Sequence, residues 1–181
     1  MITRINYLFT EFISPESHMV EINGHRYTIC PFLSKGSFGS VYGAKDEAAE
    51  EMVAIKLITD TGVIKKEELF KKATTEIDFL EKLTSSKNVV TIRNSEVLKD
   101  SSVAIVMEMC YNSLQDLMDI GFFQNGIVLP KDVISGVVPF LVDAIEQLRS
   151  KNIVHFDLKP GNILRCGKLW KVRQILILQN S

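Results

Sequence analysis

The sequence predicts an α+β protein, because β-rich stretches alternate with a segment of helical period. Strand-like residues run from Tyr27 to Leu33, and two more β-rich stretches span residues 89–98 and 101–109. Between them, over residues 65–83, apolar side chains recur at steps of three and four, which is the period of a helix with one apolar face. We therefore expect strands, then one helix, then more strands.

Two further helices are predicted in the second half of the chain. The first begins near Ser113, whose hydroxyl can cap the free N–H groups of a first helical turn. The second covers residues 133–148, where apolar residues again recur with helical period. Pro139 lies inside it and should bend or break the helix, because proline lacks an N–H and its ring crowds the preceding turn.

Composition places the chain of 181 residues among ordinary globular proteins, with 46% hydrophobic and 24% charged residues. A net charge of -1 gives no electrostatic reason to expect nucleic acid or an anionic membrane as a partner. No apolar run approaches the length of a membrane span. The cysteines Cys30, Cys110 and Cys166 form no Cys-x-x-Cys pair, so we expect neither zinc nor a disulfide framework, and a cytosolic or nuclear location.

The stretch with the most chemical information is residues 153–164, where polar residues lie between two apolar runs. Asp157 can accept the proton of a hydroxyl nucleophile, Lys159 can neutralise a migrating phosphoryl group, and Asn162 can offer an oxygen to Mg²⁺. The alternative is a plain turn, in which Pro160 and the following glycine only reverse the chain and Asp157 is a solvated charge.

This stretch resembles the catalytic loop of eukaryotic protein kinases, H-R-D-x-x-x-x-N, with His155, Asp157 and Asn162 in register. Lys159 is similar to the lysine of the serine/threonine-specific form, Asp-Leu-Lys-Pro-x-Asn. The resemblance implies that Asp157 is the catalytic base, Lys159 a second catalytic group and Asn162 a Mg²⁺ ligand. Phe156 replaces the arginine that pairs with a phosphorylated activation loop, so we expect no such switch and a Phe156 buried under the loop.

An upstream segment resembles the glycine-rich loop of the same family, G-x-G-x-x-G-x-V, with Ser34 in place of the first glycine. Glycines between apolar strands suit a hairpin whose backbone can approach phosphate groups closely, although an ordinary hairpin turn has the same composition. The resemblance implies that ATP contacts the residues Leu33, Ser34, Lys35, Gly36, Ser37, Phe38, Gly39, Ser40 and Val41.

Lys56 lies in the middle of a short apolar strand. A lysine between apolar neighbours is costly to bury unless an anion compensates its charge. In the kinase pattern Val-Ala-Ile-Lys, this lysine contacts the phosphates of ATP and pairs with a helix glutamate, while Ala54 packs against the adenine. We assign the glutamate to Glu76, with Glu68 and Glu81 as competitors. The alternative is an edge strand whose lysine reaches solvent.

The residues after the last predicted strand resemble the kinase hinge. Backbone groups near Glu108 and Cys110 would hydrogen-bond the adenine edge, and Leu164 would also contact the nucleotide. The family fold implies an antiparallel sheet with one packed helix in an N-lobe and a partly formed helical C-lobe. The expected organisation is an N-terminal extension at 1–24, the N-lobe at 25–110, the partial C-lobe at 111–165 and an atypical tail at 166–181.

One feature of the family is missing after Asn162. No Asp or Glu occurs from Leu158 to Ser181, whereas a kinase uses the aspartate of an Asp-Phe-Gly segment to hold Mg²⁺. We therefore expect a serine/threonine kinase domain truncated within its C-lobe. The Leu129-Pro130 pair and the Lys-Pro-Gly-Asn-Ile core are similar to those of the IκB-kinase-related branch.

Three functions are compatible with these patterns. The first is a serine/threonine protein kinase that uses ATP and Mg²⁺ and acts on a protein substrate. The second is a catalytically silent nucleotide-binding or interaction module that competes with a full-length relative for partners, since the second aspartate is missing. The third is an unrelated α+β domain.

Overall fold

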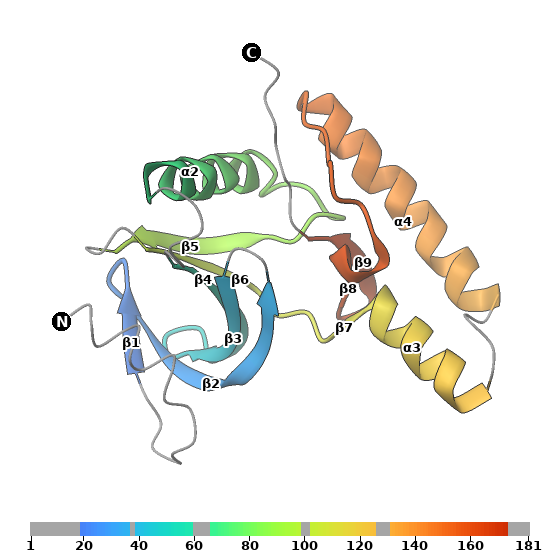
Figure 1. Cartoon of the computed structure of the whole chain (residues 1–181), viewed down its shortest axis with the longest axis horizontal. Coiled ribbons are helices and arrows are strands. Elements are labelled where there is room, and N and C mark those ends of the chain that lie inside the picture. Colours follow the sequence, from blue (N-terminus) through green and yellow to red (C-terminus); the bar gives the residue numbers. More distant parts are fainter. Residues whose placement is uncertain (1–18, 37–38, 60–65, 99–101, 126–130, 174–181) are drawn as a thin grey trace. The chain divides into compact units, whose positions relative to one another are not determined.

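Figure 1 shows the chain as a computed structural model, which describes residues 19–36, 39–59, 66–98, 102–125 and 131–173. The chain divides into two compact units. The first unit contains Met1–Ile77 and Ile92–Met109, and the second contains Asp78–Thr91 and Cys110–Ser181.

The first unit is built on a six-stranded antiparallel sheet with the strand order β1-β2-β3-β4-β6-β5 (Figure 1). Its core gathers buried side chains from five of these strands, among them Val20, Tyr27, Tyr42, Ile55 and Val106. This antiparallel sheet with a following helix confirms the predicted α+β fold class. The strands are β1 (Met19–Ile22), β2 (His25–Gly36), β3 (Gly39–Asp46), β4 (Glu51–Ile58), β5 (Ile92–Val97) and β6 (Val103–Glu108).

Helix α2 spans Lys66–Lys82 and agrees with the helix predicted over residues 65–83 to within one residue at each end. Ala73, Ile77 and Leu80 are buried. Their spacing of four and three places them on one face. The apolar residues that recur with helical period in the sequence therefore form the packed side of the helix. Acidic residues in the first turn and a lysine in the last also complement the helix dipole.

The second unit combines two helices, a 3₁₀ turn and a three-stranded antiparallel sheet of order β7-β8-β9. One core joins Leu114, Val137, Ile163 and Trp170. A second cluster joins Leu83, Val89, Leu148 and Ile153. The elements are β7 (Asn112–Ser113), α3 (Leu114–Asn125), α4 (Lys131–Ser150), η1 (Pro160–Asn162), β8 (Ile163–Cys166) and β9 (Leu169–Val172).

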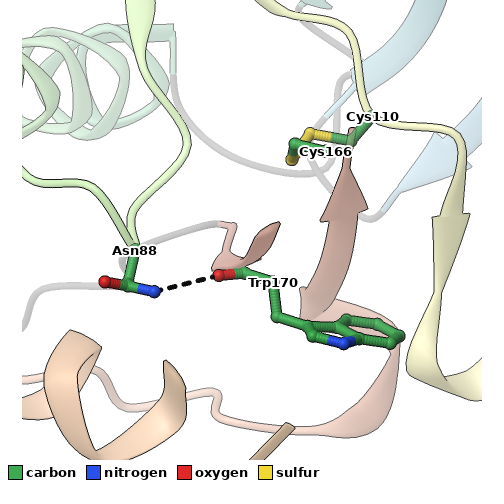
Figure 2. Close-up of a disulfide and its surroundings, with 4 residues drawn as sticks. All are labelled: Asn88, Cys110, Cys166 and Trp170. Carbon is green, nitrogen blue, oxygen red and sulfur yellow. Dashed lines mark hydrogen bonds between the residues drawn. A yellow bond between two sulfur atoms is a disulfide. The ribbon is translucent and has the colours of Figure 1, made fainter. Parts of the chain in front are cut away.

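Hydrogen bonds tie residues 88–90 to β9. The N–H of Val172 donates to the carbonyl of Asn88 at 2.8 Å, and the N–H of Val90 donates back to Val172 at 3.0 Å. The side-chain amide of Asn88 donates to the carbonyl of Trp170 at 3.3 Å (Figure 2) and accepts from Gln147 at 3.3 Å. The buried Asn88 therefore has partners for both ends of its amide, as burial requires.

The region expected to be an N-terminal extension contains the first strand of the sheet. β1 pairs with β2 from Met19 opposite Thr28 to Ile22 opposite His25. The turn between them is the Asn-Gly pair at 23–24, whose φ angles of 47° and 79° are both positive. Positive φ at both central positions is what a tight hairpin turn needs, because it matches the twist of the flanking strands.

Residues expected to form an atypical tail also belong to a sheet. β8 and β9 form a hairpin with Arg165 opposite Trp170 and Cys166 opposite Leu169. Gly167 takes a φ of 62° in the turn, a conformation that glycine adopts without steric cost. Residues 166–172 are therefore an ordered part of the second unit.

Helix α4 is one continuous helix of 20 residues that contains Pro139. We expected Pro139 to bend or break the helix, and of these two outcomes the break is wrong, whereas the bend stays a prediction. Val137, Ala144 and Leu148 are buried along the helix, and this packing offsets a proline cost of about 3 kcal/mol. Among the described residues, no helix has the length and apolar character needed to cross a membrane.

Candidate active site

Lys56 and Glu76 form a close ion pair in the first unit. Lys56 lies in the middle of β4, between Val41 of β3 and Ile105 of β6, so neighbouring strands fix its backbone on both sides. Its Nζ lies 2.6 and 2.8 Å from the two carboxylate oxygens of Glu76 on α2. The two side chains are only 12% and 15% exposed. The predicted ion pair is present, and its role toward ATP stays a prediction.

The hairpin between β2 and β3 carries the residues predicted to contact phosphate. Ser37 and Phe38 lie outside the described residues. At Gly39, where φ is 151°, a Cβ atom would collide with the backbone carbonyl oxygen of Leu57. Glycine is therefore required here by the contact between β3 and β4, a requirement that the sequence pattern does not reveal. The paired residues of the hairpin are Ser34–Val41, Lys35–Ser40 and Gly36–Gly39.

Three more predicted nucleotide contacts lie on the same sheet. Ala54 is buried on β4 and pairs with Met107 of β6. Glu108 is the next residue on β6, so the sheet brings Ala54 and Glu108 onto adjacent strands. Leu33 on β2 is exposed, which leaves its side chain accessible to a ligand.

The residues of the predicted catalytic loop, in the second unit, hold one another by hydrogen bonds. Asn162 is buried, and its Nδ2 donates to the backbone carbonyl of Asp157 at 2.7 Å and to Asp157 Oδ2 at 2.9 Å. The Nζ of Lys159 lies 2.8 Å from the same Oδ2. Among the described residues, the side-chain contacts of Asp157 thus fall on Oδ2, which leaves Oδ1 to accept a hydrogen bond from a hydroxyl group.

Asp157 has the charge state of a base. The hydrogen bond from Lys159 is the largest influence and holds the pKa of the Asp157 carboxyl below its ordinary value, against the opposing effect of burial, with a smaller lowering by Asn162. The carboxyl is therefore ionised at neutral pH. The Lys159 side chain is 59% exposed, so this pair orients the carboxylate more than it stabilises the fold.

His155 is held as a neutral ring with a defined proton position. The backbone N–H of Asp157 donates to Nδ1 at 3.2 Å, and Nε2 lies 3.3 Å from the carbonyl oxygen of Arg173. An Nδ1 that accepts and an Nε2 that donates assign the proton to Nε2. Burial lowers the pKa of His155 and outweighs the hydrogen bond to Arg173 and the nearby Asp157 carboxylate.

Phe156 does not pack under the loop as we expected. Its side chain is 54% exposed. The inside of the loop is occupied by polar groups, the partly buried His155 ring and the buried Asn162 amide, which are hydrogen-bonded to the backbone. A buried phenyl ring would have to displace these bonds, so the prediction of a buried Phe156 is wrong.

Arg173 follows β9 and was not predicted from the sequence as part of the loop. Its backbone N–H donates to the carbonyl of Asn162 at 2.8 Å, and its guanidinium donates to the carbonyl of Gly161 at 3.3 Å. Its own carbonyl accepts from His155. These contacts depend on the β8–β9 hairpin, which returns the chain to the loop, and no sequence pattern marks them.

A disulfide joins Cys110 to Cys166 within the second unit (Figure 2). The two residues are 56 positions apart in the sequence. They meet because β7 pairs with β8, and the N–H of Tyr111 extends the ladder by donating to the carbonyl of Arg165 at 3.1 Å. The prediction that the cysteines form no disulfide is wrong for this pair, because spacing along the chain does not show which residues a sheet brings together. Cys30 is a free cysteine.

Both nucleotide contacts predicted for the second unit lie at this β7–β8 ladder. Cys110 precedes β7, and its side chain is engaged in the disulfide, so the predicted adenine contact concerns its backbone. Leu164 lies on β8 opposite Ser113 and is partly buried. The nucleotide roles of both residues stay predictions.

The ligands near Asn162 do not fit a magnesium ion held by protein carboxylates. Mg²⁺ in nucleotide sites is bound by one or two carboxylates together with phosphate oxygens. Lys159 compensates the Asp157 carboxylate, and no Asp or Glu follows Asp157 in the sequence. In the part of the chain that the structure describes, no three His, Cys, Asp or Glu side chains gather into a metal site. Asn162 as a Mg²⁺ ligand stays a prediction.

Comparison with known families agrees with the order of these features. The model of the protein kinase domain matches residues 27–172. This chain belongs to the protein kinase family. Kinases of this family generally use ATP and Mg²⁺, and the IκB-kinase-related branch stays a prediction within it.

Relatives of this kinase domain are protein kinases of several organisms. It is 34% identical over 153 residues to serine/threonine-protein kinase unc-51 of Caenorhabditis elegans, covering 82% of this chain and 17% of that protein. It is 33% identical over 132 residues to serine/threonine-protein kinase TAO2 of Homo sapiens, covering 73% of this chain and 10% of that protein. It is 32% identical over 144 residues to calcium-dependent protein kinase 22 of Arabidopsis thaliana, covering 78% of this chain and 28% of that protein. The kinase domain described here thus spans 10% to 28% of the length of these relatives.

Proposed function

We propose that this kinase domain binds ATP and transfers its γ-phosphoryl group to a serine or threonine hydroxyl of a protein substrate. The observation that carries the proposal is the state of Asp157. Its carboxylate is ionised, Lys159 and Asn162 hold one oxygen, and the other oxygen remains available to accept a hydroxyl proton. Membership of the protein kinase family supports phosphoryl transfer as the chemistry of this group. A cytosolic or nuclear place of action is part of the same proposal.

Each group of the catalytic loop has a separate task in this proposal. Asp157 orients the hydroxyl through Oδ1 and accepts its proton as the oxygen becomes a nucleophile. Lys159 neutralises charge that develops on the transferred phosphoryl group. His155 and Arg173 act as positioning residues, because they hold the backbone of the loop rather than the reacting atoms.

Lys56 supports nucleotide binding in the first unit. An ammonium group has three N–H donors, and the two oxygens of Glu76 accept two of them. The third donor can reach a phosphate oxygen of ATP, the group that supplies the phosphoryl for transfer. Glu76 thus orients the lysine and leaves one of its three N–H donors for the phosphate.

The proposal is tested by phosphate transfer from radiolabelled ATP to a mixture of serine- and threonine-containing peptides. Asp157→Asn should reduce the transfer rate by about 10²- to 10⁴-fold, because general-base catalysis contributes on this order. Asp143→Asn, an exposed aspartate on α4, is the matched control and should keep the parental rate. Transfer that survives Asp157→Asn would contradict the role of Asp157.

A second function is nucleotide binding without transfer, in a catalytically silent binding or interaction module. The lack of Asp and Glu in residues 158–181 favours it, because these residues supply no carboxylate ligand for a metal. This function predicts that ATP binds to the parental chain and that neither the parental chain nor Asp157→Asn transfers phosphate. Transfer that depends on Asp157 would exclude it.

A further inference from the structure

The disulfide lies where the second segment of the second unit begins. Cys110 is the first residue of that unit after Met109, and Cys166 ends β8, two residues after Leu164. Cys110 and Leu164 are the residues of this unit that the kinase resemblance predicts to contact the nucleotide, which the proposed function binds. A covalent bond that forms or breaks here therefore acts on the segment that would hold the adenine.

We propose that Cys110 and Cys166 are a reversible redox modification site, whose oxidation fixes residues 110–113 and thereby strengthens nucleotide binding. The effect on the nucleotide rests on the proposed function. The modification itself is a property of the two thiols and can be measured without any nucleotide.

Reversibility follows from how much of the surrounding structure is held by other interactions. The β7–β8 ladder and the hydrogen bond from Tyr111 to Arg165 do not involve the sulfur atoms. Leu114, Ile163 and Trp170 pack in the core beside the same strands. The bond is therefore an added restraint on a segment that these contacts already place, and the reduced chain keeps the two thiols near each other.

The two cysteines differ in their access to reagents. Cys110 is partly exposed, whereas Cys166 is 8% exposed. An external oxidant therefore reaches Cys110 first, and Cys166 is the resolving thiol. In the cytosol, one of the two places of action in the proposed function, disulfides are usually transient and redox-sensing.

The exchange is balanced with a small disulfide, such as glutathione disulfide, as the oxidant. The Cys110 thiolate attacks one sulfur of the oxidant, breaks its S–S bond and releases one thiolate of the small molecule. The Cys166 thiolate then attacks the Cys110 sulfur of the mixed disulfide and releases the second thiolate. The protein loses two electrons and two protons, and both are recovered in the two small-molecule thiols.

Oxidation should tighten binding because it removes backbone freedom before the ligand arrives. β7 is only two residues long, so the disulfide adds a covalent restraint to the short ladder that already holds residues 110–113 against β8. A segment that is already ordered loses less conformational entropy when a ligand binds to it. The disulfide supplies this order through its link to β8.

The experiment uses the full chain at two redox settings, without mutation. The protein is equilibrated with excess glutathione or with excess glutathione disulfide, and free thiols are counted by alkylation and intact mass. The affinity for ATP is then measured by isothermal titration calorimetry. We expect two fewer free thiols in the oxidised sample and a Kd for ATP that is roughly 3- to 10-fold lower.

Single substitutions locate the effect. Cys166→Ser should bind ATP like the reduced parental chain at both settings, and Cys30→Ser, the matched control at the free cysteine, should respond like the parental chain. Equal Kd values for the two parental forms, or a response that persists in Cys166→Ser, would overturn the regulatory role. An unchanged thiol count would overturn the modification itself.

The outcomes also separate this inference from the proposed function. If neither form binds ATP, the proposed function fails and the nucleotide effect fails with it, whereas the thiol count still decides whether the pair is a redox site. If both forms bind ATP equally, nucleotide binding stands and only the redox control is rejected.

Discussion

Lys56 and Asp157 each carry a charge compensated by a neighbouring side chain, and the two pairs differ in their exposure to water. The Lys56–Glu76 side chains are 12% and 15% exposed, whereas those of Lys159 and Asp157 are 59% and 28% exposed. Water screens the second pair more strongly. We therefore expect removal of a partner to affect the stability of the sheet more than that of the catalytic loop.

Lys56→Met should weaken both ATP binding and the fold. The substitution removes the predicted phosphate donor and leaves the sheltered Glu76 without its ammonium partner. We expect a loss of about tenfold or more in ATP affinity, measured by calorimetry, and about 1–3 kcal/mol of unfolding free energy, measured in urea. Lys45→Met, at an exposed lysine of β3, is the control and should change neither. An unchanged ATP affinity in Lys56→Met would remove Lys56 from the binding site.

His155 should make the fold less stable at acidic pH. Burial lowers the pKa of His155 below its ordinary value of 6.5, so the unfolded chain binds the proton at a higher pH than the folded chain. The stability contribution is therefore fully present above pH 6.5 and is lost as pH falls through the folded-state pKa. Unfolding free energies of His155→Gln should depend less on pH than those of the parental chain between about pH 7 and 5. His25→Gln, at an exposed histidine, is the matched control substitution.

At the scale of the elements, α3 begins with a capping box. The N–H of Asp116 donates to Ser113 Oγ at 3.1 Å, and the carboxylate of Asp116 accepts from the Ser113 N–H at 2.7 Å. Two N–H groups that a helix start leaves unpaired are thus satisfied reciprocally, which confirms Ser113 as the predicted N-cap.

Ser113→Ala should lower the unfolding free energy by about 1 kcal/mol, because it removes the capping hydroxyl. Asp116→Ala should have a similar effect, and the double variant should cost less than the sum, since the two side chains stabilise the same turn. Urea titrations of the four proteins measure this coupling. Strictly additive losses would contradict a shared capping box.

The Cys110–Cys166 bond also has an effect on stability. It closes a loop of 56 residues, and loop-closure entropy alone gives a stabilisation of about 4 kcal/mol for a loop of this length. Complete reduction should lower the unfolding free energy by up to about this amount, measured in urea with and without reductant. Cys166→Ser should show no further loss on reduction. An unfolding free energy of the parental chain that is the same with and without reductant would contradict the expected contribution of the disulfide to stability.

At the scale of the whole molecule, the outer surface of α4 is unusually apolar. Ile134, Val138, Val142 and Ile145 are each about half exposed and recur at steps of four and three along one side of the helix. Ala144 on the same helix is fully buried. The helix therefore has apolar residues on its exposed side as well as in its core.

Val142→Lys should raise the solubility of the chain while changing the unfolding free energy by no more than about 0.5 kcal/mol, because it replaces a surface residue. Ala144→Lys places the same side chain at the buried position and should destabilise the fold severely. Precipitation assays and urea titrations give the two readouts. A large loss of stability in Val142→Lys would show that this side of α4 is covered in solution.

Much of the fold and part of the site could be predicted from local sequence alone. The helical period of residues 65–83 predicts α2, because packing of one apolar face determines where a helix forms. A lysine in an apolar strand requires an anion, and the sequence offered three glutamates for this role. The motif spacing around Asp157 predicted a group of residues that do contact one another, because they interact over a few positions of the chain.

The tertiary structure alone decided which distant residues meet. Cys110 and Cys166 pair through the β7–β8 ladder, and Arg173 reaches the catalytic loop through the β8–β9 hairpin. Phe156 is exposed because hydrogen-bonded His155 and Asn162 fill the loop interior. Local patterns determine the elements and the short motifs, since their energies come from neighbouring residues. Strand register and packing determine the long-range contacts, and these depend on parts of the chain that no short motif contains.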